Sequence, residues 1–187
     1  MADRVEIRIA GLGGQGVVMA GALMGEAAAR AGIAAAGSSS YGSQARGGSC
    51  RSDVVLARSG EIDFPHVHRP DVLAVMSDEA YRTYLPEVAA SGAILFDPYY
   101  VKPDPADGRA HHEVAATRAA LDDGGGSAQG ANIVMLGAVA GFTGLVGVDA
   151  LAAIVAGAFP ARFSERNARL LGLGHGIGER LAKGGGK

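Results

Sequence analysis

Glycines in the spacing G-x-G-x-x-G follow an apolar run near the start of the chain, in the stretch RIAGLGGQGVVMAGALMG. They are Gly11, Gly13 and Gly16, with Gly14 and Gln15 among them. In nucleotide-binding α/β proteins, such glycines make a tight turn, admit a phosphate to the backbone and bring a helix close to a strand. Free N–H groups at the start of that helix attract an anion. The spacing therefore predicts a strand, a turn and a helix that can bind an anionic ligand.

The acidic residue that a nicotinamide site needs is missing. Such a site has an Asp or Glu at the end of the second strand, about 20 residues further on, to hold the ribose hydroxyls. Here that region reads IAAAGSSSYG without an acidic residue, Glu26 comes too early, and no arginine follows before Arg46. Dinucleotide binding is therefore disfavoured. Two alternatives remain open: a purely structural turn, and a loop whose N–H groups and Gln15 face another ligand or a partner subunit.

A second cluster of binding residues lies in the stretch SYGSQARGG, residues 40–48. Its candidates are Tyr41, Gly42, Arg46, Gly47 and Gly48. A guanidinium beside bare glycine backbone can bind a phosphate or a carboxylate. If the preceding strand ends at the same sheet edge as the glycine turn, the two loops are neighbours. The alternative is an ordinary solvated loop with a surface arginine.

Other residue types that bind metals or act as nucleophiles are sparse. Cys50 is the single cysteine, which excludes a disulfide framework and an iron–sulfur cluster held by this chain's cysteines alone. A lone cysteine is more often a small buried residue than a nucleophile. The pairs His66–His68 and His111–His112 are not complete metal-ligand sets. We interpret these histidines as ordinary polar residues and expect no catalytic residue and no metal site on this chain.

The charge and hydropathy patterns exclude several classes of protein. The formal net charge is −2, so neither a nucleic-acid nor a membrane surface is indicated. The first residues lack the order of basic, apolar and small residues that is typical of a signal peptide. No run of about 20 apolar residues is free of charges or glycines, as a membrane span would require. We therefore expect a cytoplasmic location.

The composition favours one packed domain. The chain has 187 residues, of which 48% are hydrophobic, a length and composition that can fill a core. We expect a single domain over residues 1–183 and a flexible tail at 184–187. Because aromatic residues are only 5% and glycines number 30, the core must be built from small aliphatic side chains. A partner subunit is one way to supply further burial.

The elements expected to position the two loops alternate between strands and helices. The expected strands cover residues 5–10, 33–36, 52–57, 71–76, 92–96 and 111–114, with a short extended piece at 61–66. The expected helices cover residues 17–31, 78–85, 115–121, 131–142, 149–158 and 164–182. Residues 38–50 and 122–130 are expected to be loops, and Ser77 to cap the second helix. This order predicts an α/β fold with a Rossmann-like, open, mostly parallel sheet, helices on both faces and further C-terminal helices.

Taken together, four stretches resemble the gamma subunit of 2-oxoacid:ferredoxin (acceptor) oxidoreductases. They read GLGGQGVVMAGALMGEAA, SYGSQARGG, SDVVLARSGEIDFPHVHRPDVLAVMS and GANIVMLGAVAGF, and the resemblance runs from Val5 to about Leu181. Many members read S-Y-G-P-E-x-R-G-G, where this chain has Ser43-Gln44. Gln44 can make only a neutral hydrogen bond, which leaves the role of that position open. The runs CRSDVV and EIDFP look most like the 2-oxoglutarate branch.

The resemblance implies a subunit of a complex that oxidatively decarboxylates a 2-oxoacid to acyl-CoA and CO2. The family places thiamine diphosphate, with Mg2+, on alpha and beta subunits, and 4Fe–4S clusters on an iron–sulfur, ferredoxin-like subunit. The gamma chain serves assembly and the coenzyme A side of the site, holds no cofactor alone and is inactive when isolated.

For the candidate residues, the resemblance implies loops that face coenzyme A or partner subunits. Arg46 is the expected anion contact, and Asn132 is expected to cap the helix ANIVMLG or to link it to a neighbouring loop. The alternative functions are a free-standing NAD(P)-binding oxidoreductase and a purely structural subunit.

Overall fold

The computed structural model describes residues 3–41, 48–64, 66–125 and 127–184, and its centre is a six-stranded sheet. The strand order is β2-β3-β1-β4-β5-β6. The strands are β1 (Arg4–Leu12), β2 (Ala34–Tyr41), β3 (Ser49–Ala57), β4 (Val72–Val75), β5 (Ala93–Phe96) and β6 (Ala110–Glu113). The helices are α1 (Val17–Arg30), α2 (Asp78–Tyr84), α3 (Ala116–Ala120), α4 (Ala131–Thr143), α5 (Val148–Ala158) and α6 (Ser164–Lys183). The expected α/β class is confirmed.

The sheet is mixed because one strand is reversed. Strands β1, β4, β5 and β6 pair in parallel, whereas β3 is antiparallel to both β1 and β2. Parallel neighbours need a crossover of a dozen or more residues, and only residues 42–48 separate β2 from β3. The prediction of a mostly parallel sheet therefore holds for the half that contains β4, β5 and β6.

The predicted loop at 38–50 is wrong at both ends. Strand β2 continues through Tyr41, and β3 already begins at Ser49. The two strands pair continuously from Ala34 opposite Ala57 to Tyr41 opposite Cys50. The serine-rich run is compatible with a strand because β2 lies at the sheet edge, where polar side chains can reach water.

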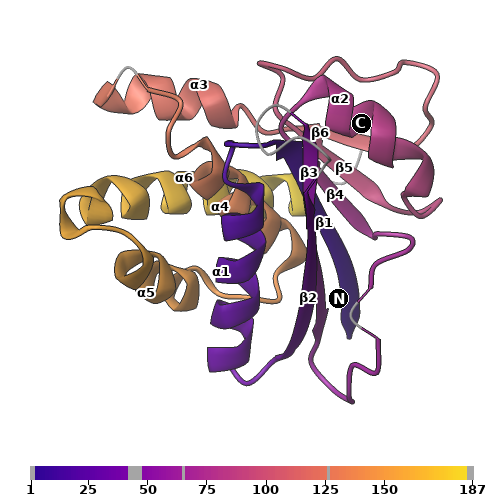
Figure 1. Cartoon of the computed structure of the whole chain (residues 1–187), viewed down its shortest axis with the longest axis horizontal. Helices are drawn as coiled ribbons and strands as arrows, with labels where there is room; N and C mark the ends of the chain where they lie inside the picture. Colours follow the sequence, from indigo (N-terminus) through magenta and orange to yellow (C-terminus); the bar gives the residue numbers. More distant parts are fainter. Residues whose placement is uncertain (1–2, 42–47, 65, 126, 185–187) are drawn as a thin grey trace.

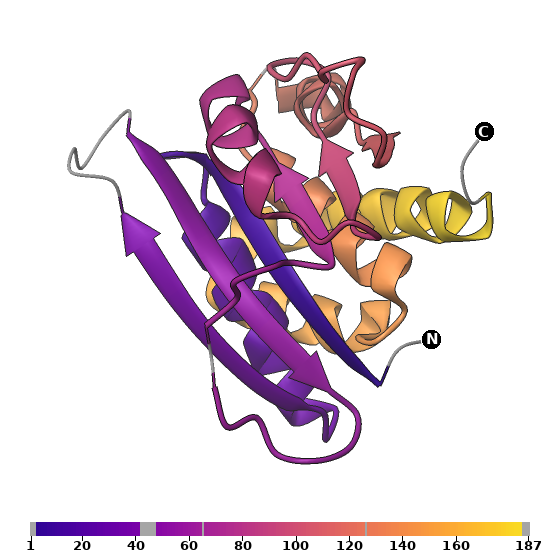
Figure 2. The same cartoon turned by 90° about the vertical axis from the view of Figure 1, so that its right-hand side faces the viewer.

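Two other connecting segments also differ from expectation. The predicted loop at 122–130 begins as a π-helical turn, Leu121–Gly125, whose Asp122 accepts a hydrogen bond from Arg118 Nε at 2.8 Å. The predicted extended piece at 61–66 pairs with no strand among its described residues. The segment crosses one sheet face, where Val67 is buried, as Figure 2 shows after β3. Residues 185–187 of the predicted tail lie outside the described residues.

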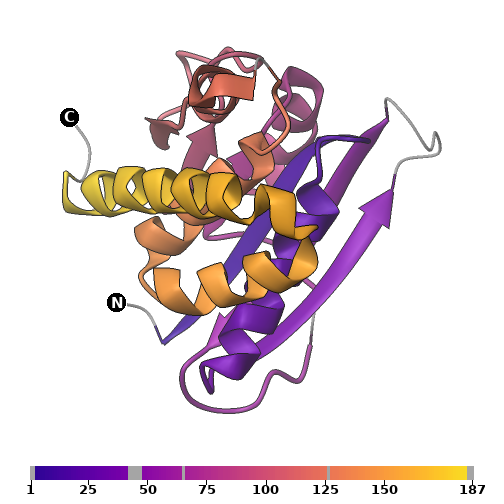
Figure 3. The ribbon, with the colours of Figure 1, turned by 90° about the vertical axis from the view of Figure 1, so that its left-hand side faces the viewer.

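Helices cover both faces of the sheet, as predicted. In Figure 1 the sheet is seen nearly edge-on, with α1, α4, α5 and α6 on one side and α2 on the other. Figure 3 shows the larger helical layer from outside, with α6 and α5 in front. On the α2 side, Tyr81 and Tyr84 pack with Leu73, Ile94 and Phe96. Ser77 caps α2 as expected, because its hydroxyl accepts a hydrogen bond from Ala80 N at 3.2 Å.

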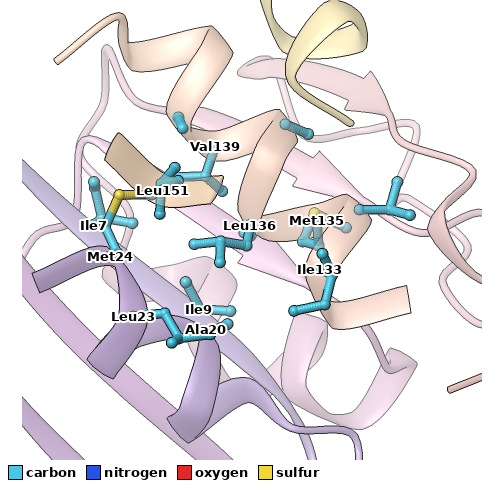
Figure 4. Packing of buried hydrophobic residues seen from close by; sticks show 14 of the residues in the cluster. Ile7, Ile9, Ala20, Leu23, Met24, Ile133, Met135, Leu136, Val139 and Leu151 are labelled. Atoms are coloured by element: carbon cyan, nitrogen blue, oxygen red, sulfur yellow. The ribbon is translucent and has the colours of Figure 1, made fainter. Parts of the chain in front are cut away.

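The larger core consists of small aliphatic side chains between β1 and the helical layer. Figure 4 shows Ile7 and Ile9 of β1 facing residues of α1, α4 and α5. These partners include Leu23, Met24, Leu136, Val139 and Leu151. Such close packing of backbones depends on glycines and alanines, which matches the expectation of an aliphatic core. Among the described residues, no helix is long and apolar enough to cross a membrane.

Candidate functional site

The glycine turn connects the carboxyl end of β1 to the start of α1. Gly14 and Gly16 have φ values of +102° and +77°, in the left-handed region that favours glycine. At Gly16 an added Cβ atom would also lie 2.5 Å from Asn132 Nδ2. The backbone path therefore favours glycine at both positions, and Gly16 is also required by its close neighbour from α4.

Gln15 holds the turn in shape through both ends of its side-chain amide. Its Oε1 accepts a hydrogen bond from Leu12 N, and its Nε2 donates to the carbonyl oxygen of Met76, each at 2.7 Å. An added Cβ at Gly11 would lie 2.5 Å from the same Oε1. Gln15 thus ties the turn to the end of β4, while it also borders the cavity described below.

The two predicted loops lie next to each other. Gly13 N donates a hydrogen bond to the carbonyl oxygen of Gly48 at 3.0 Å. This adjacency follows from the topology, because β1 and β2 are both antiparallel to β3 and so end at the same edge. Gly42, Arg46 and Gly47, and the side chain of Tyr41, lie outside the described residues. Their predicted roles stay predictions.

A cavity of about 740 Å³ lies between the starts of α1, α4 and α6. Gly14, Gln15 and Gly16 form one wall, and residues 127–133 form another. Aromatic side chains contribute a third part, from Tyr100, Phe159 and Phe163. None of the described residues that line this cavity is acidic. The cavity is therefore suited to a ligand that carries negative charge and also has apolar surface.

Two of the three helices that start at the cavity, α1 and α4, have first N–H groups without side-chain caps and without nearby acidic residues. Gly16 and Gly130 are the N-cap residues of α1 and α4, both are left-handed, and neither helix has an acidic residue in its first turn. By contrast, α2 has the Ser77 cap with Asp78 and Glu79 in its first turn. Uncapped N–H groups and the helix dipole give these two starts a positive potential. The arrangement can bind a phosphate or a carboxylate.

Asn132 links the two helix starts. Its Nδ2 donates to the carbonyl oxygen of Gly16 at 3.4 Å. Of the two roles expected for Asn132, the link to a neighbouring loop is the one observed. The N-cap position of α4 belongs to Gly130, so Asn132 does not cap this helix.

The third wall comes from residues before and within α6 that the sequence analysis missed. Arg166 Nη2 donates to the carbonyl oxygens of Ala120 and Ser127, at 3.0 and 3.2 Å. Arg162 lies over the Phe163 ring, with 4.8 Å from its Cζ to the ring centroid. Asn167 also lines the cavity. The signal in the sequence was the spacing of Arg162, Arg166 and Asn167, which places them on one side of a helical turn.

A buried ion pair stabilises the opposite face of the sheet. Arg8 is fully buried and donates from Nε and Nη2 to the two carboxylate oxygens of Asp53, at 2.7 and 3.0 Å. It also donates to Glu87 and, at 2.6 Å, to the carbonyl oxygen of Val67. Burial by itself lowers the pKa of Arg8, but Asp53 and Glu87 outweigh this and raise it. The pair joins β1, β3 and the segment after β3.

The histidines take part in separate packing contacts. His111 Nε2 lies 2.9 Å from the Tyr81 hydroxyl, and His112 packs against Phe142. Burial lowers the pKa of His112. His66 and His68 flank the exposed ring of Phe64. Within the part of the chain that the structure describes, no group of three or more His, Cys, Asp or Glu residues could hold a metal ion.

Comparison with known proteins identifies the class to which this fold and site belong. The family model of pyruvate ferredoxin/flavodoxin oxidoreductase matches residues 6–177, so the chain belongs to that family. The 2-oxoglutarate synthase subunit KorC of Methanothermobacter marburgensis is 40% identical over 171 residues, covering 88% of this chain and 91% of the relative. The pyruvate synthase subunit PorC of the same organism is 30% identical over 171 residues, covering 88% and 92%.

A solved structure confirms the fold. The gamma subunit of the keto/oxoacid ferredoxin oxidoreductase from Geobacter sulfurreducens PCA superposes with a TM-score of 0.83 and is 33% identical. The match covers 95% of this chain and 98% of that one. The likeness therefore extends over nearly the whole length of both chains, as the sequence resemblance implied.

Proposed function

We propose that the chain is the gamma subunit of a cytoplasmic 2-oxoglutarate:ferredoxin oxidoreductase, where it serves assembly and binds coenzyme A. In that reaction 2-oxoglutarate is decarboxylated and oxidised, and its acyl group passes to coenzyme A. Thiamine diphosphate with Mg2+ on alpha and beta subunits supplies the decarboxylation chemistry, and 4Fe–4S clusters on an iron–sulfur subunit supply the electron path.

The choice of 2-oxoacid follows from the relatives. The chain is 40% identical to a 2-oxoglutarate synthase subunit and 30% identical to a pyruvate synthase subunit from the same organism, over matches of similar coverage. The substrate itself meets partner subunits in this proposal, so the preference is a property of the assembled complex.

The cavity is the observation that carries the coenzyme A part of the proposal. Coenzyme A combines phosphates with an adenine ring and an uncharged arm. The cavity combines two uncapped helix starts, the Arg162 guanidinium and aromatic side chains, and no acidic residue lines it. In this proposal the N–H groups of α1 and α4 hold phosphate oxygens, Arg162 offsets their charge, and Asn132 keeps the two helix starts together.

The test is purification of the tagged chain from its native host, followed by mass spectrometry and assays with coenzyme A. We expect partners that carry thiamine diphosphate and iron–sulfur clusters, and faster oxidation of 2-oxoglutarate than of pyruvate or 2-oxoisovalerate. Faster oxidation of pyruvate would contradict the choice of substrate. A chain without partners that binds NAD(P) would overturn the proposal and favour a free-standing oxidoreductase.

A further inference from the structure

Two buried polar side chains lack the hydrogen bonds that the others have. The buried polar or charged residues among those described are Arg8, Ser52, Asp53, Ser77, Asp97, Thr117 and Asn167. The first five each have a side-chain hydrogen bond within the chain. Among the described residues, neither the Thr117 hydroxyl nor the Asn167 amide has a partner, although these residues are only 1% and 6% exposed.

Both side chains line the same cavity. Thr117 is on α3 and Asn167 is on α6, and they reach the cavity from different elements. Arg166 belongs to the same lining, and its buried Nε makes no hydrogen bond within the described residues, although it lies 3.4 Å from Asp123 Oδ2 in an ion pair. Polar groups that have no hydrogen-bond partner within the described residues and gather around one cavity are placed to bind a molecule in that cavity.

The chemistry of these groups restricts what they can bind. An amide and a hydroxyl each donate and accept, and neither carries charge. They therefore suit an uncharged group that also donates and accepts, rather than a phosphate. The cations and helix starts that suit a phosphate lie elsewhere around the cavity, at Arg162, Gly16 and Gly130. The cavity thus has both a charged and a neutral recognition region.

We infer that Thr117 and Asn167 form a subsite for the uncharged hydrogen-bonding part of a phosphorylated ligand, whose phosphates face the starts of α1 and α4. This inference rests on the proposed function for the identity of the ligand as coenzyme A. In coenzyme A the uncharged group is either an amide of the pantetheine arm or the edge of the adenine ring. Thr117 and Asn167 are then residues that determine affinity and selectivity, not catalytic residues.

The test measures ligand affinity in the assembled complex with Asn167→Leu and Thr117→Val. These changes remove the polar atoms and keep similar volumes. Calorimetry with coenzyme A and with adenosine 3′,5′-bisphosphate gives dissociation constants, and thermal unfolding without ligand reports stability. We expect each variant to weaken binding of coenzyme A about tenfold or more, as loss of a hydrogen bond to a buried group does. We expect no loss of thermal stability, since neither side chain has a partner within the described part of the chain.

Comparison of the two ligands shows which part of coenzyme A supplies the uncharged group. Weaker binding of both ligands assigns the subsite to the adenine ring, and weaker binding of coenzyme A alone assigns it to the pantetheine arm. Unchanged affinity for both would overturn the inference and leave water as the partner of these groups. Lower thermal stability with unchanged affinity would likewise overturn it, in favour of a structural role.

A matched control variant and the wild-type complex distinguish failure of the subsite from failure of the proposed function. Thr143→Val removes a hydroxyl at the other end of α4, where it donates to the carbonyl oxygen of Val139 at 2.9 Å. It should leave ligand affinity unchanged. If the wild-type complex does not bind coenzyme A, or if the chain does not assemble with partners, the proposed function fails. If wild type binds and the variants bind equally well, only the subsite fails.

Discussion

Gly137 of α4 faces the main-chain carbonyl of Leu171 on α6 so closely that a Cβ atom on Gly137 would lie under 3.0 Å from that oxygen. Gly174 of α6 has the reciprocal relationship with the carbonyl of Val134 on α4. Gly141 and Gly178 repeat the contact one helical turn further along. The backbones of α4 and α6 are therefore in direct contact along the middle and the second half of α6.

Replacing Gly137 by alanine should destabilise the protein by about 1–3 kcal/mol, because overpacking against rigid backbone forces the helices apart. The matched control is Gly172→Ala on the same α6 helix, where an added Cβ has nothing within 4 Å. There alanine should stabilise by up to about 1 kcal/mol through helix propensity. Urea unfolding of both variants gives the comparison. Equal effects would show that the helices separate easily.

Arg8→Met should cost about 3–5 kcal/mol, because it leaves the carboxylate of Asp53 buried without its partner. Asp53 is 2% exposed, so water cannot replace the guanidinium. Arg51→Met provides the control, since Arg51 lies 3.6 Å from the same carboxylate with a side chain that is 32% exposed. Its loss should cost less than 1 kcal/mol, typical of partly exposed ion pairs. Denaturant midpoints measured at neutral pH should show this order.

Asp107 should contribute an acid-sensitive part of the stability. Hydrogen bonds from Arg109 lower the pKa of Asp107 from 3.8 to about 2. Because the folded-state pKa is depressed, the contribution is complete above the unfolded pKa and is lost as pH falls from about 4 to about 2. Asp107→Asn should lower stability at pH 7 and flatten its pH dependence in that range. Asp63→Asn, which removes an exposed carboxylate, is the matched control.

Arg46→Ala should raise the KM for coenzyme A in the assembled complex or weaken assembly, because a guanidinium beside glycine backbone can bind an anion. The charge-matched control is Arg30→Ala, which removes an exposed arginine paired with Glu26 at the far end of α1. Steady-state kinetics and size-exclusion chromatography separate the two effects. Unchanged kinetics together with an intact complex would contradict a role for Arg46.

The sequence predicts local structure well where the residues that determine it lie in one short stretch. The glycine spacing indicates the turn before α1, and Ser77 with two acidic residues marks the start of α2. Strand β3 is antiparallel to β2 because only a short connection separates the two strands. The sequence did not indicate the full length of β2, because its serines are usual in loops. The adjacency of Gly13 and Gly48 followed only once both strands had been assigned to one edge.

The rest of the candidate site depends on contacts between distant segments. Thr117 and Asn167 are ordinary residues in their own helices, and only the packing of α3 and α6 places them around one cavity. In the sequence, the reciprocal glycines of α4 and α6 are merely weak helix formers. Their role is to let the backbone of the other helix come close, which only the packed structure shows. Arg8 likewise lies in a strand, whereas its partners come from β3 and from the residues after α2.

The residues that line the cavity lie far apart in the sequence, which has a consequence for synthesis of the chain. Residues 14–16 are made early, yet they share the cavity with Asn132 and with Asn167 of α6. A chain synthesised only as far as α5 has the glycine turn and both helix starts, but it lacks the wall that closes the cavity. Since chains emerge from the ribosome from the N-terminal end, the complete cavity of the proposed function forms only after α6 has been made and has packed against α4. Under the proposed function, truncated products that lack α6 would therefore not compete with the finished subunit for the ligand.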